Sequence, residues 1–184
     1  MRNKEDSNMI WVDLEMTGLE NDHVILEIAT IVTDANLTEL AVGPAIAIKR
    51  SDTELDNINE WSLEQHTKSG LLDRVRASTE SLAMAERTTL DFLETWANPG
   101  ASPICGNSIA TDRRFIRKEM PKLDSFLHYR MVDVSTIKEL VARWYPELDV
   151  PVKQSRHLAL SDIRESIEEL RWYKEQIFKD VNTT

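Results

Sequence analysis

The fold is decided by the stretch MIWVDLEMTGL, residues 9–19, which places two acids inside an apolar run. Side chains alternate between the two faces of a strand, so Asp13 and Glu15 would point the same way, about 7 Å apart at their backbones. Two carboxylates on a buried strand repel each other and resist desolvation, and a bound divalent cation relieves both effects. The Asp-x-Glu spacing is also common without a metal, so the rest of the chain has to decide.

Size and composition predict one soluble domain over residues 1–184, with an ordered core over about 8–178. The chain contains no apolar run near the ~20 residues of a membrane helix, and its polar N-terminus lacks the apolar core of a signal peptide. The single cysteine, Cys105, allows no internal disulfide. We therefore expect a cytoplasmic protein with no membrane partner.

The formal net charge is −10. This argues against a protein that grips long nucleic acid, because such binding depends on many Lys and Arg residues that neutralise phosphates. It leaves room for a small phosphate-bearing substrate held by a few local groups. An acidic balance also suits a metal site that is built from carboxylates.

Hydrophobic patterns predict an α/β fold with a central five-stranded mixed sheet flanked by helices. The β-branched run over 24–34 is the second strand, in which Glu27 is expected to be a hydrogen-bonded structural acid. Residues 40–49 return as a third strand, where Pro44 indicates an edge or a bulge. Short loops make the first three strands antiparallel. Two brief parallel strands are expected later, at 103–105 and 129–133.

Capping signals and helical spacing place the helices between and after these strands. A capping box at Ser62 predicts a short helix, and a second capping box at Thr136 predicts the helix that runs to about 144. Three further amphipathic helices are expected over 79–97, 109–120 and 158–178.

Two later motifs carry further acids on these elements. Asp112 lies in the first turns of the helix that follows Asn107 and Ser108, where an acid is often only a partner of the helix dipole. His157 precedes Asp162 by five residues, at the start of the last helix. Taken alone, this pair fits an ordinary loop histidine and a helix-start acid, so both interpretations stay open from spacing.

Taken together, the acids in this chain order resemble the DEDD exonucleases in their histidine-bearing DEDDh branch, and most closely the oligoribonuclease family. The match extends over nearly the whole chain. Its quoted segments are IWVDLEMTGL (10–19), EIATIVTDANL (27–37), SPICGNS (102–108), HYRMVDVSTIKEL (128–140) and SDIRESIEEL (161–170). Ser161 departs locally from the family, in which a further acid is expected in many members.

The resemblance implies a ribonuclease H-like fold and two divalent cations, Mg²⁺ or Mn²⁺. It implies His157 as the general base and four acids as metal ligands: Asp13, Glu15, Asp112 and Asp162. Oxygen ligands suit these hard cations. Two metals roughly 3.5–4 Å apart can stabilise the attacking and leaving oxygens of an in-line displacement. A neutral imidazole with a pKa near the operating pH can accept the proton of the attacking water.

The resemblance also implies how short substrates are selected. Leu19 would wedge between two bases, and Trp61 would stack on one. A cap on the 5′ phosphate would use Ser108, Tyr129, Arg130, Ser135 and Thr136, with His66 approaching the same phosphate. Relatives are homodimers, in which Tyr129 would act on the partner's substrate.

Plainer roles remain open for several of these residues. Leu19 would merely cover the edge of the core, and Trp61 would be a hydrophobic staple before a helix. Tyr129 would be packing at a strand start, and Arg130 would form a surface ion pair.

We therefore predict a metal-dependent 3′→5′ exoribonuclease that degrades very short oligoribonucleotides, especially dinucleotides, to 5′-nucleoside monophosphates. The alternatives are a proofreading-type DNA exonuclease and a non-catalytic binding module on the same fold. The acidic balance and the expected phosphate cap argue against the first alternative, because a longer strand needs a basic groove. The five filled catalytic positions argue against the second.

Overall fold

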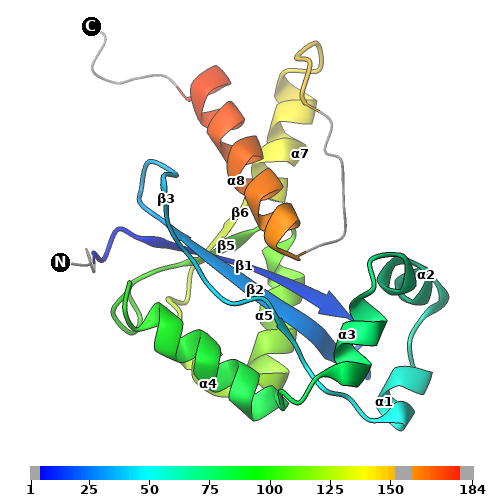
Figure 1. Ribbon diagram of the computed structural model, residues 1–184. Coiled ribbons are helices and arrows are strands. Elements are labelled where there is room, and N and C mark those ends of the chain that lie inside the picture. The colour runs from blue at the N-terminus through cyan, green and yellow to red at the C-terminus, as the bar shows by residue number, and fades with distance from the viewer. Residues whose placement is uncertain (1–4, 152–158, 179–184) are drawn as a thin grey trace, which may run out of the picture.

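A six-stranded mixed sheet forms the centre of the computed structural model, which describes residues 5–151 and 159–178 (Figure 1). Strand β1 (Met9–Met16) lies in the middle of the sheet, antiparallel to β2 (Ile25–Thr33) and parallel to β5 (Ile104–Gly106). Strand β6 (Met131–Asp133) extends the sheet in parallel beyond β5. The expected mixed sheet, with three antiparallel strands followed by two parallel ones, is confirmed, apart from a division of its third strand.

The stretch expected to form one strand over 40–49 forms two strands instead. These are β3 (Glu39–Val42) and β4 (Ile46–Ala47), and both pair antiparallel with β2. Pro44 has no N–H to give to a ladder, and the Gly43 N–H donates to the Thr30 carbonyl at 2.9 Å at the point of the break. The sheet therefore has six strands rather than five.

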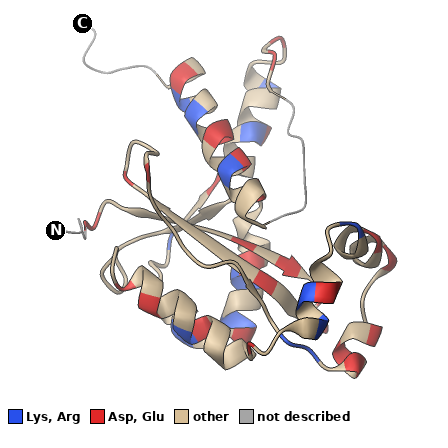
Figure 2. Cartoon of the chain, viewed as in Figure 1, with Lys and Arg blue, Asp and Glu red and all other residues tan. Residues whose placement is uncertain are grey.

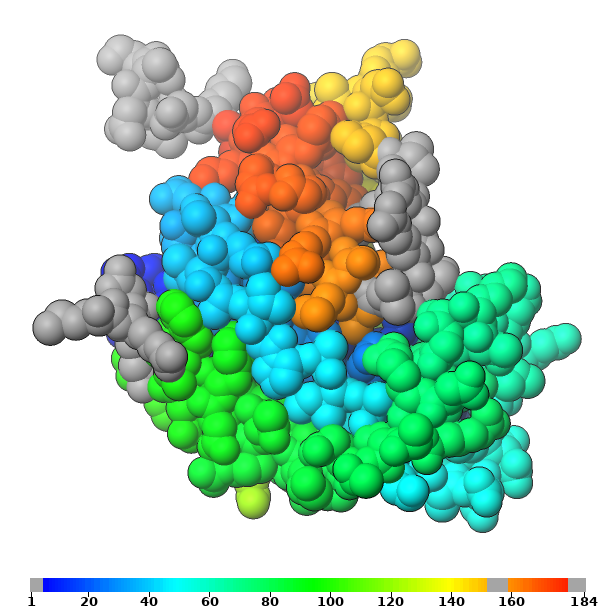
Figure 3. Space-filling view, in the orientation of Figure 1, coloured from blue at the N-terminus to red at the C-terminus, as the bar shows by residue number. Residues whose placement is uncertain are grey.

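Helices cover both faces of the sheet (Figure 1). One face packs against α4 (Leu82–Leu93), α5 (Ile109–Glu119) and α6 (Pro121–Phe126). The other face packs against α7 (Val134–Trp144) and α8 (Ala159–Gln176). In Figure 3 the first turns of α8, in orange, lie against the cyan strand segment, where an ion pair of 3.1 Å joins α8 to β3.

Alternation along β1 connects this layering to the site. Ile10, Val12 and Leu14 enter the core beneath α4, α5 and α6, while Trp11 enters the core beneath α7 and α8. Asp13 and Glu15 continue the same alternation, so the sheet turns both acids toward the face that carries α8.

Three short helices follow β4, where the sequence predicted only one. They are α1 (Asp52–Asp56), α2 (Glu60–Lys68) and α3 (Leu71–Ala77). The capping box belongs to α1, where Ser51 and Glu54 cap each other's backbone. Helix α2 begins before Ser62, whose N–H instead donates to the side chain of the N-cap residue Asn59 at 2.7 Å.

Other helix ends also differ from the expectation. Helix α4 starts after its N-cap Ser81 and is shorter than the stretch 79–97. Pro121 ends α5, as expected, but it also opens α6 as the first residue of a new helix. Helix α7 is capped by Asp133, whose carboxylate accepts from the Ser135 N–H at 2.9 Å.

Among the described residues, no helix combines the length and apolarity needed to span a bilayer.

The close approach at the β3–β4 break predicts that Gly43→Ala destabilises the fold. A Cβ there would lie 2.2 Å from the Thr30 hydroxyl oxygen and 2.8 Å from the Phe92 ring. Overpacking of this kind costs about 1–3 kcal/mol, and each kcal/mol lowers the Tm of a chain of this size by about 2–4 °C. Thermal unfolding followed by circular dichroism measures the shift. Ala45→Ser, a substitution at a nearby exposed residue, is the control. Equal Tm values for the two variants would contradict the expectation.

Candidate active site

Three carboxylates from the two ends of the chain converge on one point. Asp13 and Glu15 lie on one face of β1 near its C-terminal end, and Asp162 lies in the first turn of α8. Each offers an oxygen atom, and these atoms all lie within 4.8 Å of one another. Figure 2 shows acidic residues at the arrowhead end of β1 and on β2 beside it. The carboxylate oxygens form a donor set that suits a hard divalent cation.

Asp112 joins this cluster through the main chain of β1. Strand β5 ends at Gly106, so beyond Trp11 the β5 side of β1 has no strand partner. The Leu14 N–H on this open side donates to Asp112 Oδ1 at 3.0 Å. Gly106 makes the approach of α5 feasible, because a Cβ there would lie 3.1 Å from the Val12 carbonyl oxygen. Asp112 therefore lies beside the two acids of β1 rather than on the surface of its helix.

The electrostatics confirm that these acids share one environment. Burial is the main cause that raises the pKa of Asp13 well above its usual range, followed by repulsion from Asp112 and Glu15. Burial, with repulsion from Asp162 and Glu27, raises the pKa of Glu15 to about 8. Burial raises the pKa of Asp112 to about 7, although the Leu14 N–H favours its charged form. The residues present therefore fit a cation, since positive charge would offset the burial and the repulsion alike.

A cavity of about 430 Å³ opens in front of the acids. Its lining includes Asp13, Glu15 and Asp162, and also Leu19, Trp61 and His66, three residues expected from the sequence to contact substrate. The site can therefore receive a molecule of small-ligand size.

The side chains of Leu19 and Trp61 are each 58% exposed, so neither behaves as core. Trp61 is the second residue of α2, whose N-cap is Asn59, so the staple position before the cap is Ile58 instead. The plainer role left open for Trp61 is therefore not met, and both apolar side chains are exposed at the rim of the cavity.

His66 lies beside Glu15, deep in α2. It is almost fully buried, its Nε2 atom lies 2.9 Å from the Met16 carbonyl oxygen, and its Nδ1 atom lies 3.7 Å from Glu15 Oε2. Because a carbonyl only accepts, Nε2 carries the proton in this contact, and Nδ1 faces the carboxyl group. The structure thus brings His66 to the acid cluster.

The expected phosphate-cap residues form a second group around the start of α7. Asp133 Oδ1 accepts from the N–H groups of both Ser108 and Ser135, each at 2.9 Å. The hydroxyl groups of these two serines lie 3.2 Å apart. Thr136 is the next residue along α7 and is exposed.

Tyr129 and Arg130 are exposed just before β6, and the Arg130 guanidinium lies 5.3 Å from the centre of the Tyr129 ring. The ring of Tyr129 is therefore not packed into a strand start. It is 72% exposed and forms a cation–π contact with its neighbour.

A chain of hydrogen bonds connects this second group to the acids. The Ser135 hydroxyl donates to Asn107 Oδ1 at 3.0 Å, and Asn107 Nδ2 donates to the Ser166 hydroxyl at 2.8 Å. Ser166 in turn donates to the Asp162 carbonyl at 2.8 Å. Sequence reasoning treated Asn107 only as part of a helix cap and did not single out Ser166, because the partners are 59 residues apart.

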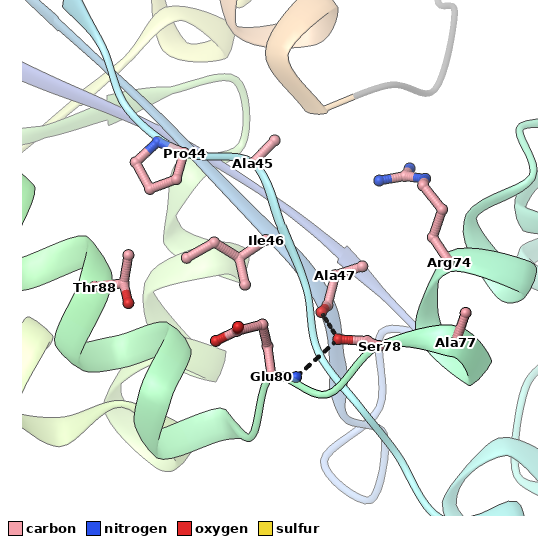
Figure 4. A pocket seen from close by; sticks show the side chains of 9 residues that line it. All are labelled: Pro44, Ala45, Ile46, Ala47, Arg74, Ala77, Ser78, Glu80 and Thr88. Atoms are coloured by element: carbon pink, nitrogen blue, oxygen red, sulfur yellow. Dashed lines mark hydrogen bonds between the residues drawn. The ribbon is translucent and has the colours of Figure 1, made fainter.

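Glu27 lies directly opposite Glu15 in the β1–β2 register and is buried. Its carboxylate is paired with Arg74 of α3. Arg74 also lines a second cavity, of about 540 Å³, beneath β4 (Figure 4). Ser78 also lines this cavity, and its hydroxyl donates to the Ala47 carbonyl at 2.6 Å. It contains none of the expected site residues, so the smaller cavity in front of the acids is the candidate active site.

The signal for Glu27 was visible in the sequence, since an acid interrupted an apolar strand. Nothing in the sequence indicated Arg74 as its partner. His157 lies outside the described residues, so its expected role stays a prediction.

Comparison with known proteins identifies the family. A family model described as "Exonuclease" matches residues 10–170. A protein named "Oligoribonuclease" from Pseudomonas syringae pv. syringae is 56% identical over 180 residues, which are 97% of this chain and 99% of that protein. Another of that name, from Photobacterium profundum, is 57% identical over 175 residues, 94% of this chain and 97% of that protein. The chain belongs to the oligoribonuclease family.

Solved structures agree with this assignment at the level of the fold. The zinc-bound form of the Escherichia coli exonuclease I–ssDNA complex superposes with a TM-score of 0.73 at 16% identity, covering 94% of this chain and 41% of that chain. Exonuclease I from Methylocaldum szegediense gives a TM-score of 0.65 at 16% identity, covering 92% and 41%. The exonuclease fold and the nuclease class expected from the sequence are thus confirmed for this member of the oligoribonuclease family.

The buried pair beneath the site predicts that Arg74→Ala destabilises the protein. The change leaves the Glu27 carboxylate buried beside Glu15 without its cationic partner. Loss of a partner for a buried polar group costs about 1–3 kcal/mol. Chemical denaturation measures the change in unfolding free energy. Arg76→Ala is a matched control on the same helix, because Arg76 pairs only at 3.9 Å with exposed Asp73. Equal losses in the two variants would contradict a special role for the buried pair.

The raised pKa values predict that the metal-free cluster destabilises the fold as pH increases. The folded state keeps protons on Glu15 up to about pH 8 and on Asp112 up to about pH 7. Carboxyl groups in the unfolded chain lose their protons near pH 4. The stabilisation that the protonated cluster gives the folded state is therefore complete below about pH 4, and it is lost as the pH rises through the pKa values of the folded state. Mn²⁺ should then raise the Tm more at pH 8 than at pH 6, because ligands bind in their deprotonated form.

Thermal unfolding at pH 6 and pH 8, in chelator and in Mn²⁺, measures both effects. Asp162→Asn removes one charge from the cluster. It should flatten the pH dependence and shrink the Mn²⁺-induced shift relative to the unchanged protein. A variant with the same pH slope and the same Mn²⁺ shift would show that the acids do not act together.

Proposed function

We propose that this chain is a metal-dependent 3′→5′ exoribonuclease for very short oligoribonucleotides, above all dinucleotides. The observation that supports this most strongly is the convergence of the Asp13, Glu15 and Asp162 carboxylates, with Asp112 beside them, in a member of the oligoribonuclease family. The products would be 5′-nucleoside monophosphates.

The four acids would hold two cations, Mg²⁺ or Mn²⁺. When bound, such cations activate a water molecule and stabilise charge on the leaving oxygen. The chain's own contribution is to keep the carboxylates aimed at one point, since β1 and the start of α8 fix their main chains. His157 would take the proton of the attacking water at a ring nitrogen.

The rim of the cavity would bind the bases. Leu19 and Trp61 are exposed there, and stacking of a base on an aromatic ring contributes about 1–3 kcal/mol while tolerating any sequence. Leu19 would enter between two bases as a wedge. The sequence assigned His66 to the 5′ phosphate, but His66 lies next to Glu15, so it would instead approach a phosphate at the acid cluster.

The second group would close the site at the 5′ phosphate. Arg130 can form a forked pair with phosphate oxygens, and the hydroxyls of Ser108, Ser135 and Thr136 add donors at a helix start. Such a cap would block a strand that continues beyond the 5′ phosphate, which would explain a preference for short substrates. The exonuclease I structures in complex with ssDNA carry the same fold within a longer chain, so the cap is what would separate the two kinds of substrate.

We further propose a cytoplasmic homodimer of single-domain chains. Leu140 and Trp144 lie one turn apart on α7 and are 37% and 66% exposed, so they give this helix an apolar outer face. Tyr129, which is also exposed, would reach the substrate of the partner subunit.

A length series of 5′-phosphorylated oligoribonucleotides tests the proposed function. The kcat/KM is expected to fall by about tenfold or more beyond a few nucleotides, a factor that corresponds to about 1.4 kcal/mol of lost transition-state binding. A chelator and the Asp162→Ala variant should each abolish turnover while the circular dichroism spectrum stays unchanged. Flat rates across lengths would refute the cap, and a preference for the matched DNA series would favour a DNA exonuclease.

A further inference from the structure

Three consecutive residues of α5 each bind the main chain of a different part of the site. Asp112 accepts from β1, as described above, Arg113 reaches the segment 128–130, and Arg114 reaches the loop that carries Leu19. We propose that Arg113 and Arg114 are positioning residues that set the phosphate cap and the base wedge in register with the acids. The inference rests on the proposed function, since it assigns roles relative to Leu19 and Arg130.

Arg114 and Lys118 hold the wedge loop by its backbone. One guanidinium nitrogen of Arg114 donates to the Leu19 carbonyl, and the other lies 3.3 Å from Asn21 Oδ1. Lys118 lies one turn further along α5, and its Nζ donates to the Asn21 carbonyl at 2.7 Å and the His23 carbonyl at 3.0 Å. The carbonyls of alternate residues in this loop therefore all turn toward one helix.

The loop is also fixed from inside. Thr17 Oγ1 and His23 Nδ1 lie 3.0 Å apart, and the His23 ring lies so close to Gly18 that a Cβ there would be 2.4 Å from Nε2. The main chain of Leu19 thus has a defined position between this internal contact and Arg114. Its apolar side chain is left exposed at the cavity that contains Asp13 and Glu15.

Arg113 holds the cap segment in the same way. It is buried, its Nε donates to Asp124 at 3.0 Å, and its Nη1 lies 2.9 Å from the His128 carbonyl oxygen and 3.0 Å from that of Tyr129. The Arg130 carbonyl oxygen lies 3.4 Å from the same nitrogen. Because the carbonyls point inward, the side chains of Tyr129 and Arg130 are directed to solvent.

Helix geometry explains why neighbouring residues can do this. Successive side chains of an α-helix project about 100° apart, so three in a row address three directions from a single turn. One rigid turn therefore sets the relative positions of the acids, the wedge and the cap. A wedge and a cap at a fixed separation would measure the length of the substrate, which a loose arrangement could not do.

The test is a set of double-mutant cycles for hydrolysis of a 5′-phosphorylated diribonucleotide. Arg114→Ala and Leu19→Ala should each raise KM about tenfold, with a smaller change in kcat and an unchanged Mn²⁺ affinity by calorimetry. The combined variant should be no worse than Leu19→Ala, because the arginine acts through the leucine. Arg113→Lys should couple in the same way to Arg130→Ala and should be additive with Leu19→Ala.

Arg87→Ala is the matched control. It removes one positive charge and an exposed helical pair with Asp91, far from these contacts in the sequence. Its KM should equal that of the unchanged protein.

Three results would overturn the inference. Arg114→Ala with normal KM while Leu19→Ala is impaired would reject the positioning role and leave the proposed function standing. Normal KM in Leu19→Ala itself would refute the wedge on which both depend. Additive effects of Arg114→Ala and Leu19→Ala would show that the arginine acts elsewhere.

The buried position of Arg113 calls for a second variant, in case Arg113→Lys does not fold. Asp124→Asn keeps the shape of the partner and loosens the orientation of the guanidinium. It should raise KM by a smaller factor that vanishes in an Arg130→Ala background. An unchanged KM in Asp124→Asn would overturn the role of Arg113.

Discussion

Repulsion among buried carboxylates is the constraint to which the rest of the molecule is adapted. Two like charges 4 Å apart repel by about 4 kcal/mol at an effective dielectric of 20. Asp13, Glu15 and Asp162 each place an oxygen atom within 4.8 Å of the others, and Glu27 adds a fourth charge from the adjacent strand. The fold accepts this unfavourable concentration of charge because neighbouring elements hold the acids in place, which leaves a site that cations would stabilise.

Each neighbouring element offsets part of that repulsion in a different way. Arg74 of α3 pairs with Glu27, so the charge of the acid opposite Glu15 on β2 is balanced. The Leu14 N–H gives Asp112 a hydrogen bond that favours its charged form. These contacts offset only part of the effect, since the pKa values of Asp13, Glu15 and Asp112 all stay raised. Such raised pKa values in a cavity are the arrangement expected of a functional site rather than of a structural ion-pair network.

The sequence predicted the features that depend on local pattern. Alternation on β1 placed Asp13 and Glu15 on one face, and helical spacing placed Asp162 at the start of α8. Prediction from the sequence failed where contacts between residues far apart in the chain determine the structure. The strand over 40–49 is divided at Gly43, where a side chain would collide with Thr30 and Phe92. Helix α2 begins before Ser62 because the side chain of Asn59 caps it. Arg74 and Arg113 were missed because their partners come from other elements, which periodicity cannot reveal.

The same distinction separates the chemistry of this fold from its specificity. The acids sit on β1 and α8, elements fixed by the two cores of the sheet, so their convergence follows from hydrophobic packing. Leu19, Tyr129 and Arg130 sit on loops, which packing does not fix, and the main chains of these loops are held by charged hydrogen bonds from α5. Loops can change without loss of the core. In the proposed arrangement, the acids carry out the reaction, and the arginine contacts of a single helix set which length of substrate reaches them.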